Sequence, residues 1–186
     1  MISFLLGRFV FLLFSKFFRF LKFLIAKDFV QLILTIPEEP YANKGHNQKP
    51  SFYDLAIVCF TPYSANILKN SSFWCIDGTF KYCPKEFNQQ FEIMAKNDLT
   101  GAYEICVLVY MTRKTETLYL HAFSAIASWF LRKDGQIDFK LERILTDFEK
   151  ASINAMQQIF KPKLIEGCYF HAVSKWWKHA TKNGFI

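Results

Sequence analysis

Residues 73–81 constrain the fold of this chain more than any other stretch. Residues 73–76 are apolar, Asp77 follows them directly, and Gly78 comes next. A short apolar run bounded by a turn residue is typical of a buried strand. A charge at the end of such a strand is costly unless it is paired or bound to a metal. The pattern predicts that Asp77 stands at the mouth of a site. The question is whether a second carboxylate stands beside it.

A second carboxylate, Asp147, lies in the same kind of context. It comes just after an expected strand at residues 139–145, and a helical pattern begins at Phe148. In an open sheet, sites form where neighbouring strand ends meet. Two ionised carboxylates close together repel by about 1 to 4 kcal/mol, and a bound divalent cation removes this cost. Asp77 and Asp147 therefore form a candidate Mg²⁺ or Mn²⁺ site of the kind that supports two-metal phosphoryl transfer.

An ordinary structural role also explains each aspartate. Asp is favoured near a helix N-terminus, which suits Asp147. Asp is also common in turns, which suits Asp77. The residues alone leave both interpretations open.

The order of the expected elements places the chain in the α/β class. Residues 91–96 alternate between apolar and polar side chains, and residues 103–111 are nearly all apolar, as in a central strand. With residues 73–76 they form an antiparallel meander. Helices and strands then alternate: a helix at 117–132, a strand at 139–145, a helix from 148, a strand at 164–165 and a helix at 171–180. The predicted order is βββ-α-β-α-β-α in a mixed sheet.

A linker is expected before this unit. Residues 28–50 are assigned to it because they include Pro37, Pro40, Pro50 and Gly45. After the linker, residues 53–59 read as a weak helix, and a short helix begins at Pro62.

Residues 1–27 are expected to form a basic hydrophobic helix. Phe and Leu dominate it, and its longest uncharged run, residues 9–15, is too short for a membrane span of about 20 residues. Three interpretations stay open. Residues 1–26 lie in a membrane interface, form an uncleaved signal-like segment, or are an accessory helix or upstream sequence read into the frame.

Charge and cysteine content indicate which partners and which redox compartment suit the protein. The net charge is +7, and residues 1–28 and 161–186 each carry five Lys or Arg against one acidic residue. Basic ends suit a polyanion or a membrane surface as partner. The five cysteines are odd in number and form no Cys-x-x-Cys, so a reducing, intracellular setting without a disulfide framework is expected.

Three motifs resemble the transposase domain of Mutator-like elements (MULE). They are the residues 73–81, 145–151 and 166–171, in that order along the chain. The likeness covers residues from about 52 to the C-terminus, and residues 51–186 are assigned to a partial MULE transposase domain. Animal members of this family often carry FLYWCH-type zinc fingers elsewhere in the chain.

The resemblance implies a ribonuclease-H-like fold and a DDE-type triad of carboxylates that binds two Mg²⁺ or Mn²⁺ ions. Asp77 would be the first catalytic and metal-binding acid, and Asp147 the second. The implied activity is DNA strand cleavage and transfer, with DNA as partner and the nucleus as location. A homo-oligomer is a further expectation. Residues 1–26 leave a membrane-associated location as the alternative.

The third acid of the family is a Glu beyond the Cys-x-x-His motif. No acidic residue follows His171 in this sequence, and Glu166 precedes the motif. The triad is therefore expected to be incomplete and the chain to be a truncated fragment or decayed copy, inactive by itself. The alternative is a non-catalytic DNA-binding or interaction module derived from a transposase.

Cys168 and His171 form the family's Cys-x-x-His signature, which lies near the active site in that family. A Cys-x-x-His pair is also half of a zinc site, but no further Cys or His stands at a fitting spacing. The simpler interpretation is a buried Cys on a strand and a His that begins a helix.

The last expected helix mixes cations with aromatic rings. Lys175, Lys178 and Lys182 are the candidate nucleic-acid-binding residues, and Trp176 and Trp177 are available for base stacking. The alternative is an amphipathic helix with Trp177 packed inward and the lysines in water. No helix-turn-helix, zinc finger or RNA-binding motif is visible.

Overall fold

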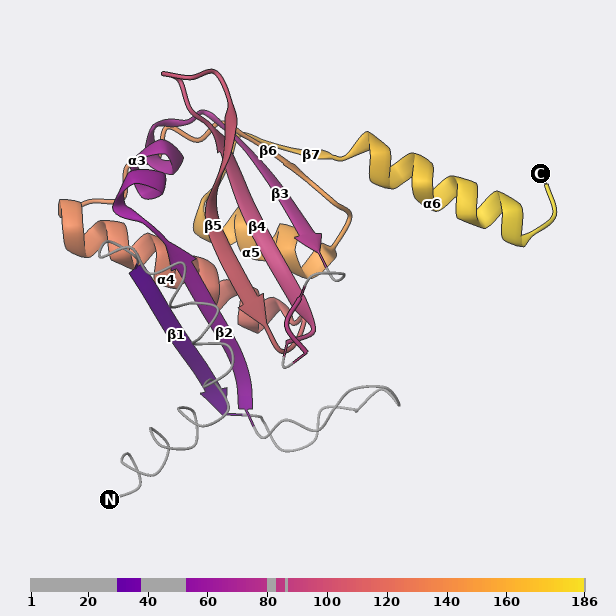
Figure 1. The fold of residues 1–186 in the computed structure, drawn as a ribbon, viewed down its shortest axis with the longest axis horizontal. Helices are drawn as coiled ribbons and strands as arrows, with labels where there is room; N and C mark the ends of the chain where they lie inside the picture. Colours follow the sequence, from indigo (N-terminus) through magenta and orange to yellow (C-terminus); the bar gives the residue numbers. More distant parts are fainter. Residues whose placement is uncertain (1–29, 38–52, 80–82, 86, 186) are drawn as a thin grey trace.

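The computed structural model describes residues 30–37, 53–79, 83–85 and 87–185. Within them a seven-stranded sheet runs in the order β1-β2-β5-β4-β3-β6-β7 (Figure 1). The strands are β1 (Val30–Pro37), β2 (Tyr53–Phe60), β3 (Phe73–Thr79), β4 (Gln89–Lys96), β5 (Tyr103–Met111), β6 (Arg143–Thr146) and β7 (Leu164–Gly167). The helices are α3 (Pro62–Asn70), α4 (Glu116–Asp134), α5 (Lys150–Ile159) and α6 (Tyr169–Lys182).

The sheet is mixed, as expected from the sequence. Strands β3, β4 and β5 form the predicted antiparallel meander, and β6 and β7 add to β3 in parallel. From β3 onward the elements follow the predicted order βββ-α-β-α-β-α. Because parallel neighbours need a crossover connection, α4 and α5 supply the links to β6 and β7.

Two stretches before β3 differ from the prediction. Residues 53–59, expected to be helical, belong to strand β2, which pairs with β1 along its whole length and with β5. Residues 56–60 are buried, and a short, wholly apolar run has no clear period, so its pairing decides its structure. Residues 30–37, assigned to the linker, form β1. The rest of the linker and the expected N-terminal hydrophobic helix lie outside the described residues.

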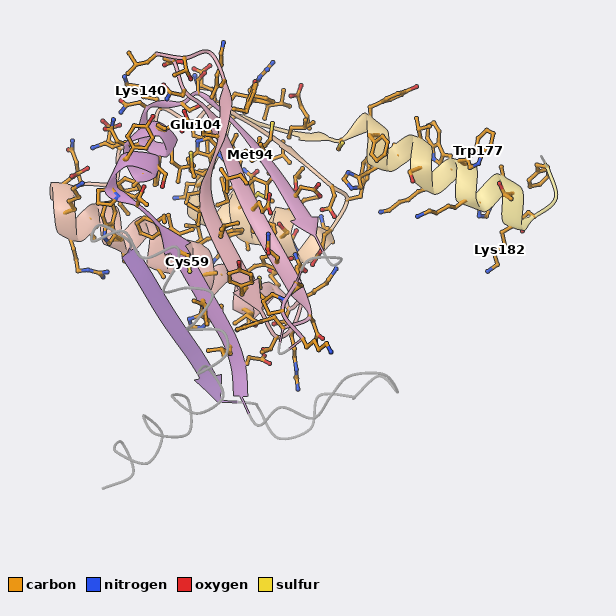
Figure 2. The ribbon with its side chains drawn as sticks, in the orientation of Figure 1. Cys59, Met94, Glu104, Lys140, Trp177 and Lys182 are labelled. Atoms are coloured by element: carbon orange, nitrogen blue, oxygen red, sulfur yellow. The ribbon has the colours of Figure 1, made fainter. Side chains whose placement is uncertain are left out.

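The last helix is arranged unlike the others. In Figures 1 and 2, α6 extends away from the sheet, and its side chains, Trp177 and Lys182 among them, project from the helix. None of its residues is buried. The described residues contain no helix that is both long enough and apolar enough to cross a membrane.

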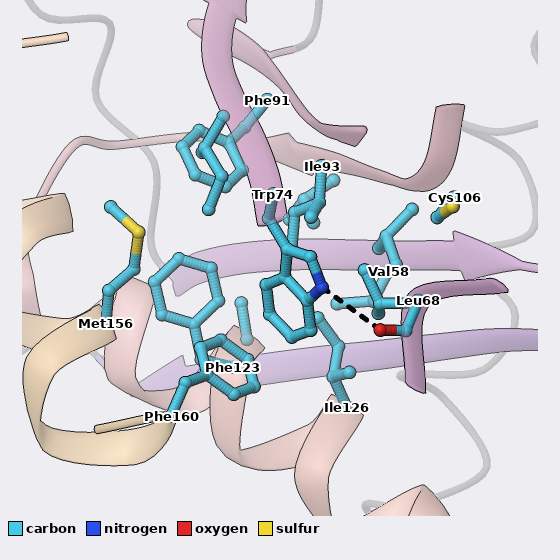
Figure 3. Packing of buried hydrophobic residues seen from close by; sticks show 14 of the residues in the cluster. Val58, Leu68, Trp74, Phe91, Ile93, Cys106, Phe123, Ile126, Met156 and Phe160 are labelled. Carbon is cyan, nitrogen blue, oxygen red and sulfur yellow. Dashed lines mark hydrogen bonds between the residues drawn. The ribbon is translucent and has the colours of Figure 1, made fainter. Parts of the chain in front are cut away.

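The main core lies between the sheet and helices α4 and α5. Trp74 of β3 is fully buried there, near Phe160 (Figure 3), and packs edge-to-face against Phe139 and Phe160. Its indole N–H donates a hydrogen bond of 3.0 Å to the carbonyl oxygen of Leu68, at the end of α3. Trp74 therefore joins β3, α3 and the helical layer.

A smaller cluster occupies the other face of the sheet. It consists of Ile57, Cys59, Phe87 and Tyr110. Burial raises the pKa of the Cys59 thiol to about 12, so this thiol is neutral at physiological pH and acts as an apolar side chain.

Replacing Trp74 by Phe tests this packing. We expect Trp74→Phe to lower the free energy of unfolding by about 2 kcal/mol, because the Leu68 carbonyl loses its donor and the core loses part of a ring. Urea denaturation followed by far-UV circular dichroism measures the change. The matched control is Trp176→Phe on α6, where the side chain is 72% exposed and the expected change is below about 0.5 kcal/mol. Equal losses in the two variants would contradict the packing described.

Candidate functional site

The two candidate aspartates lie at the same level of neighbouring strands, Asp77 within β3 and Asp147 directly after β6. Strand β3 pairs with β6 in parallel, and Ile76 is the register partner of Thr146. Asp77 and Asp147 are each one residue further along. Since neighbouring strands lie about 4.8 Å apart, the backbone segments that carry the two aspartates run side by side. The predicted adjacency of the two strands is confirmed, but Asp77 does not end its strand: β3 continues to Thr79, and Asp77 is the register partner of Glu92 in β4.

Each aspartate is held by a backbone amide of its own segment. The N–H of Gly78 donates to Asp77 Oδ1 at 2.8 Å, and the N–H of Glu149 donates to Asp147 Oδ1 at 3.1 Å. The Asp77 side chain is 54% exposed, and Asp147 is half-buried. Each carboxylate thus has one oxygen fixed by a backbone amide, and neither carboxylate is fully buried.

The start of helix α6 lies at the same place. Strand β7 pairs with β6, and the N–H of Cys168 donates to the carbonyl oxygen of Thr146 at 2.7 Å. In the first turn of the helix, His171 Nε2 lies 3.7 Å from Asp77 Oδ1. The structure therefore brings the Cys-x-x-His pair to the two strand ends that carry the aspartates.

Cys168 lies near a second thiol, that of Cys75. Burial raises the pKa of the Cys75 thiol, and the neighbouring Cys168 raises it further. The simpler interpretation expected Cys168 to be buried in a strand. Cys168 is instead the N-cap of α6 and only half-buried. Among the described residues no three His, Cys, Asp or Glu side chains come together as a metal-binding group.

A glycine at the end of β7 joins the second and third motifs. A Cβ atom on Gly167 would lie 2.5 Å from the ring of Phe148, so a larger residue here would have to displace this exposed ring. Lys175 of α6 places its ammonium group 5.3 Å from the centre of the same ring. Phe148 thus fixes the segment after β6 against β7 and the first turns of α6.

Sequence reasoning missed a buried polar chain beneath the site. Gln89 Nε2 donates to the hydroxyl of Tyr119 at 2.7 Å, and that hydroxyl donates to Glu149 Oε1 at 2.9 Å. Gln89 and Tyr119 are fully buried, and Lys114 Nζ lies 3.6 Å from Glu149 Oε2. Burial and then the Glu149 carboxylate raise the pKa of Tyr119, so its hydroxyl stays a neutral donor. The available signal was Gln89 itself, a polar residue at an inward position of a strand.

The cations of α6 are exposed, as the nucleic-acid interpretation requires. Lys175, Lys178 and Lys182 all lie at the surface. Trp177, expected to pack inward in the alternative interpretation, is 65% exposed, and Trp176 is exposed as well. The prediction that Trp177 packs inward is therefore wrong, because α6 extends beyond the sheet that would have covered this side chain.

The donor set suits a hard divalent cation. Two aspartate carboxylates can bind Mg²⁺ or Mn²⁺, whose remaining positions are filled by water or substrate oxygens. A closed site with three or more protein ligands is not formed by the described residues. The geometry thus offers two carboxylates and a neighbouring imidazole at one end of the sheet.

The comparison with protein families agrees with this arrangement. The family model described as the MULE transposase domain matches residues 73–175, more than half of the 186-residue chain. Searches of curated proteins and of solved structures found no match. The matched range begins with β3, contains both aspartates and the Cys-x-x-His pair, and extends into α6. The chain belongs to the MULE transposase domain family.

Proposed function

We propose that this chain is part of a transposon-derived DDE transposase with a ribonuclease-H-like catalytic domain. In this proposal, Asp77 and Asp147 are the catalytic carboxylates that act in metal-dependent cleavage and transfer of DNA strands. The observation that carries the proposal is the parallel register of Ile76 with Thr146, which puts both aspartates one residue beyond the same level of adjacent strands. The proposed DNA chemistry implies a nuclear location.

The chain's own residues would hold and orient the reacting groups. Asp77 and Asp147 would bind Mg²⁺ or Mn²⁺, which neutralises phosphate charge and activates water or a 3′-hydroxyl for attack on a phosphodiester. The amides of Gly78 and Glu149 fix one oxygen of each carboxylate. His171, beside Asp77, adds a group that can donate a hydrogen bond to a phosphate oxygen.

The described residues supply two of the three acids that the family uses. Two carboxylates can bind one cation weakly, but two-metal catalysis needs more oxygen ligands. We therefore expect the chain by itself to bind metal without cleaving DNA.

A second candidate function is a non-catalytic DNA-binding module. The observation that favours it is α6, where Lys175, Lys178 and Lys182 are exposed together with Trp176 and Trp177. Lysines neutralise backbone phosphates, and exposed aromatic rings stack on unpaired bases. This function needs neither aspartate.

Metal titration separates the two functions. We expect calorimetry to show Mn²⁺ binding that Asp77→Asn and Asp147→Asn each weaken at least about tenfold, because each removes one of two negative charges next to the cation. The matched control is Asp98→Asn in the exposed turn between β4 and β5, which should bind Mn²⁺ as the parent does. Absence of Mn²⁺ binding in the parent, or an equal loss in the control, would remove the catalytic proposal.

The role of α6 is tested with DNA. We expect replacement of Lys175, Lys178 and Lys182 by Gln to reduce the slope of log K against log salt by about 3 for duplex DNA, since each phosphate contact contributes about 0.9. Fluorescence anisotropy between 50 and 200 mM salt, the range in which such slopes are commonly read, measures it.

The control for this test carries the same loss of charge elsewhere. Lys96, Lys140 and Lys161 are exposed and lie outside α6, and their replacement by Gln should change the slope less. Equal slopes for both triple variants would show that α6 has no special part in DNA binding. Binding that survives combined replacement of both aspartates would favour the non-catalytic module.

A further inference from the structure

The two residues whose amides hold the aspartates are connected beneath the site. On one side, Gly78 donates its N–H to Asp77 and lies directly on Gln89, because a Cβ atom at Gly78 would come within 2.9 Å of Gln89 Nε2. On the other side, Glu149 donates its N–H to Asp147. The side chains of Gln89 and Glu149 are joined through one atom, the hydroxyl oxygen of Tyr119.

The direction of the hydrogen bonds is determined by the chemistry of the groups. An ionised carboxylate only accepts, so the Tyr119 hydroxyl must donate its single proton to Glu149. The hydroxyl oxygen is then left as an acceptor, and the amide of Gln89 donates to it at 2.7 Å. The chain Gln89–Tyr119–Glu149 is therefore a directed bridge with one arrangement.

Burial makes this bridge stiff. Gln89 and Tyr119 have no exposed surface, and Tyr119 packs against Phe91 and Phe123 in the main core. Water cannot replace a lost partner at such a position without a change in the packing, so breaking the bridge leaves polar groups unpaired. The Glu149 end is also held by Lys114.

We propose that Gln89, Tyr119 and Glu149 form a positioning bridge that sets the spacing of the Asp77 and Asp147 carboxylates and so their affinity for a divalent cation. The effect on metal affinity rests on the proposed function, whereas the existence of the bridge does not. Glu149 acts here through its amide and its anchored side chain and is not a ligand. Groups that orient metal ligands in this way typically change metal affinity by about 10- to 100-fold when removed.

The first test uses Tyr119→Phe, which removes only the shared hydroxyl and keeps the ring. Calorimetry should show Mn²⁺ affinity at least about tenfold below that of the parent. The matched control is Tyr110→Phe, another buried tyrosine, on the opposite face of the sheet, which should change the affinity by less than about twofold. Unchanged affinity in Tyr119→Phe, in a parent whose binding needs both aspartates, overturns the bridge and leaves the proposed function standing.

The second test separates positioning from metal ligation. Glu149→Gln keeps an oxygen that accepts the Tyr119 hydrogen bond, so its Mn²⁺ affinity should stay within about threefold of the parent, whereas Glu149→Ala should behave as Tyr119→Phe does. If Glu149→Gln loses as much affinity as Asp147→Asn, Glu149 is a ligand and the positioning role is wrong.

The third test needs no metal. In the metal-free protein, amide hydrogen exchange measured by NMR should become faster at both Gly78 and Glu149 in Tyr119→Phe, while the amide of Gly101, in a distant turn, serves as an internal control. Unchanged exchange at both amides overturns the bridge even if the parent binds no Mn²⁺. If the parent binds no Mn²⁺ but exchange becomes faster in Tyr119→Phe, the bridge stands. Its role in metal binding and the proposed catalytic function are then both wrong.

Discussion

The parallel pairing of β3 with β6 is the constraint on which the rest of the structure depends. These strands are separated in the sequence by β4, β5 and α4, yet Ile76 and Thr146 are register partners. The core enforces this register, because Trp74 and Ile144 are also partners and both are fully buried. A slip by one residue would turn these side chains out of the core and would separate the levels of Asp77 and Asp147. Core packing thus determines the geometry at the strand ends.

The placement of two acids at one end of the sheet is electrostatically unfavourable in itself. Two ionised carboxylates repel each other, and the repulsion weakens as their separation and their exposure to water increase. The structure offsets part of this by giving each carboxylate a backbone N–H, from Gly78 and from Glu149. Those two amides belong to segments tied together by Gln89 and Tyr119. The polar groups in the interior thus support an arrangement of charges at the surface.

Local patterns predicted most of the fold from β3 onward but little before it. The alternation in β4, the apolar run of β5 and the helical spacing of α4 each carry a clear period, so their types and order were predicted correctly. Strand β2 was missed because residues 56–60 are buried without any polar position to set a period. Strand β1 was missed because its partner β2 was predicted to be a helix. An edge strand pairs with one neighbour, so without β2 there was no strand for β1 to pair with.

Part of the candidate site could be predicted from local sequence, and part of it is formed only when the chain folds. Asp77 and Asp147 each end an apolar run, so the local sequence predicted strands leading up to both, although β3 continues past Asp77 to Thr79. The bridge of Gln89, Tyr119 and Glu149 could not, because its members come from β4, α4 and the segment after β6 and meet only in the folded chain. The exposure of Trp177 was also beyond sequence reasoning. An amphipathic pattern predicts a face to be covered but not whether the chain covers it.

The position of α6 links the two parts of the proposed function. Its first turn places His171 beside Asp77, and its exposed cations continue from Lys175 to Lys182 along the same helix. A nucleic acid backbone that follows these cations toward the helix N-terminus arrives at the end of the sheet where β3 and β6 finish. The N-terminal end of a helix also favours phosphate, because its free amides and its dipole attract negative charge. In the proposed function, DNA binding along α6 and metal binding at the aspartates would therefore share one surface, and the hydrogen bond from the Cys168 N–H to the Thr146 carbonyl oxygen joins the start of α6 to the end of β6.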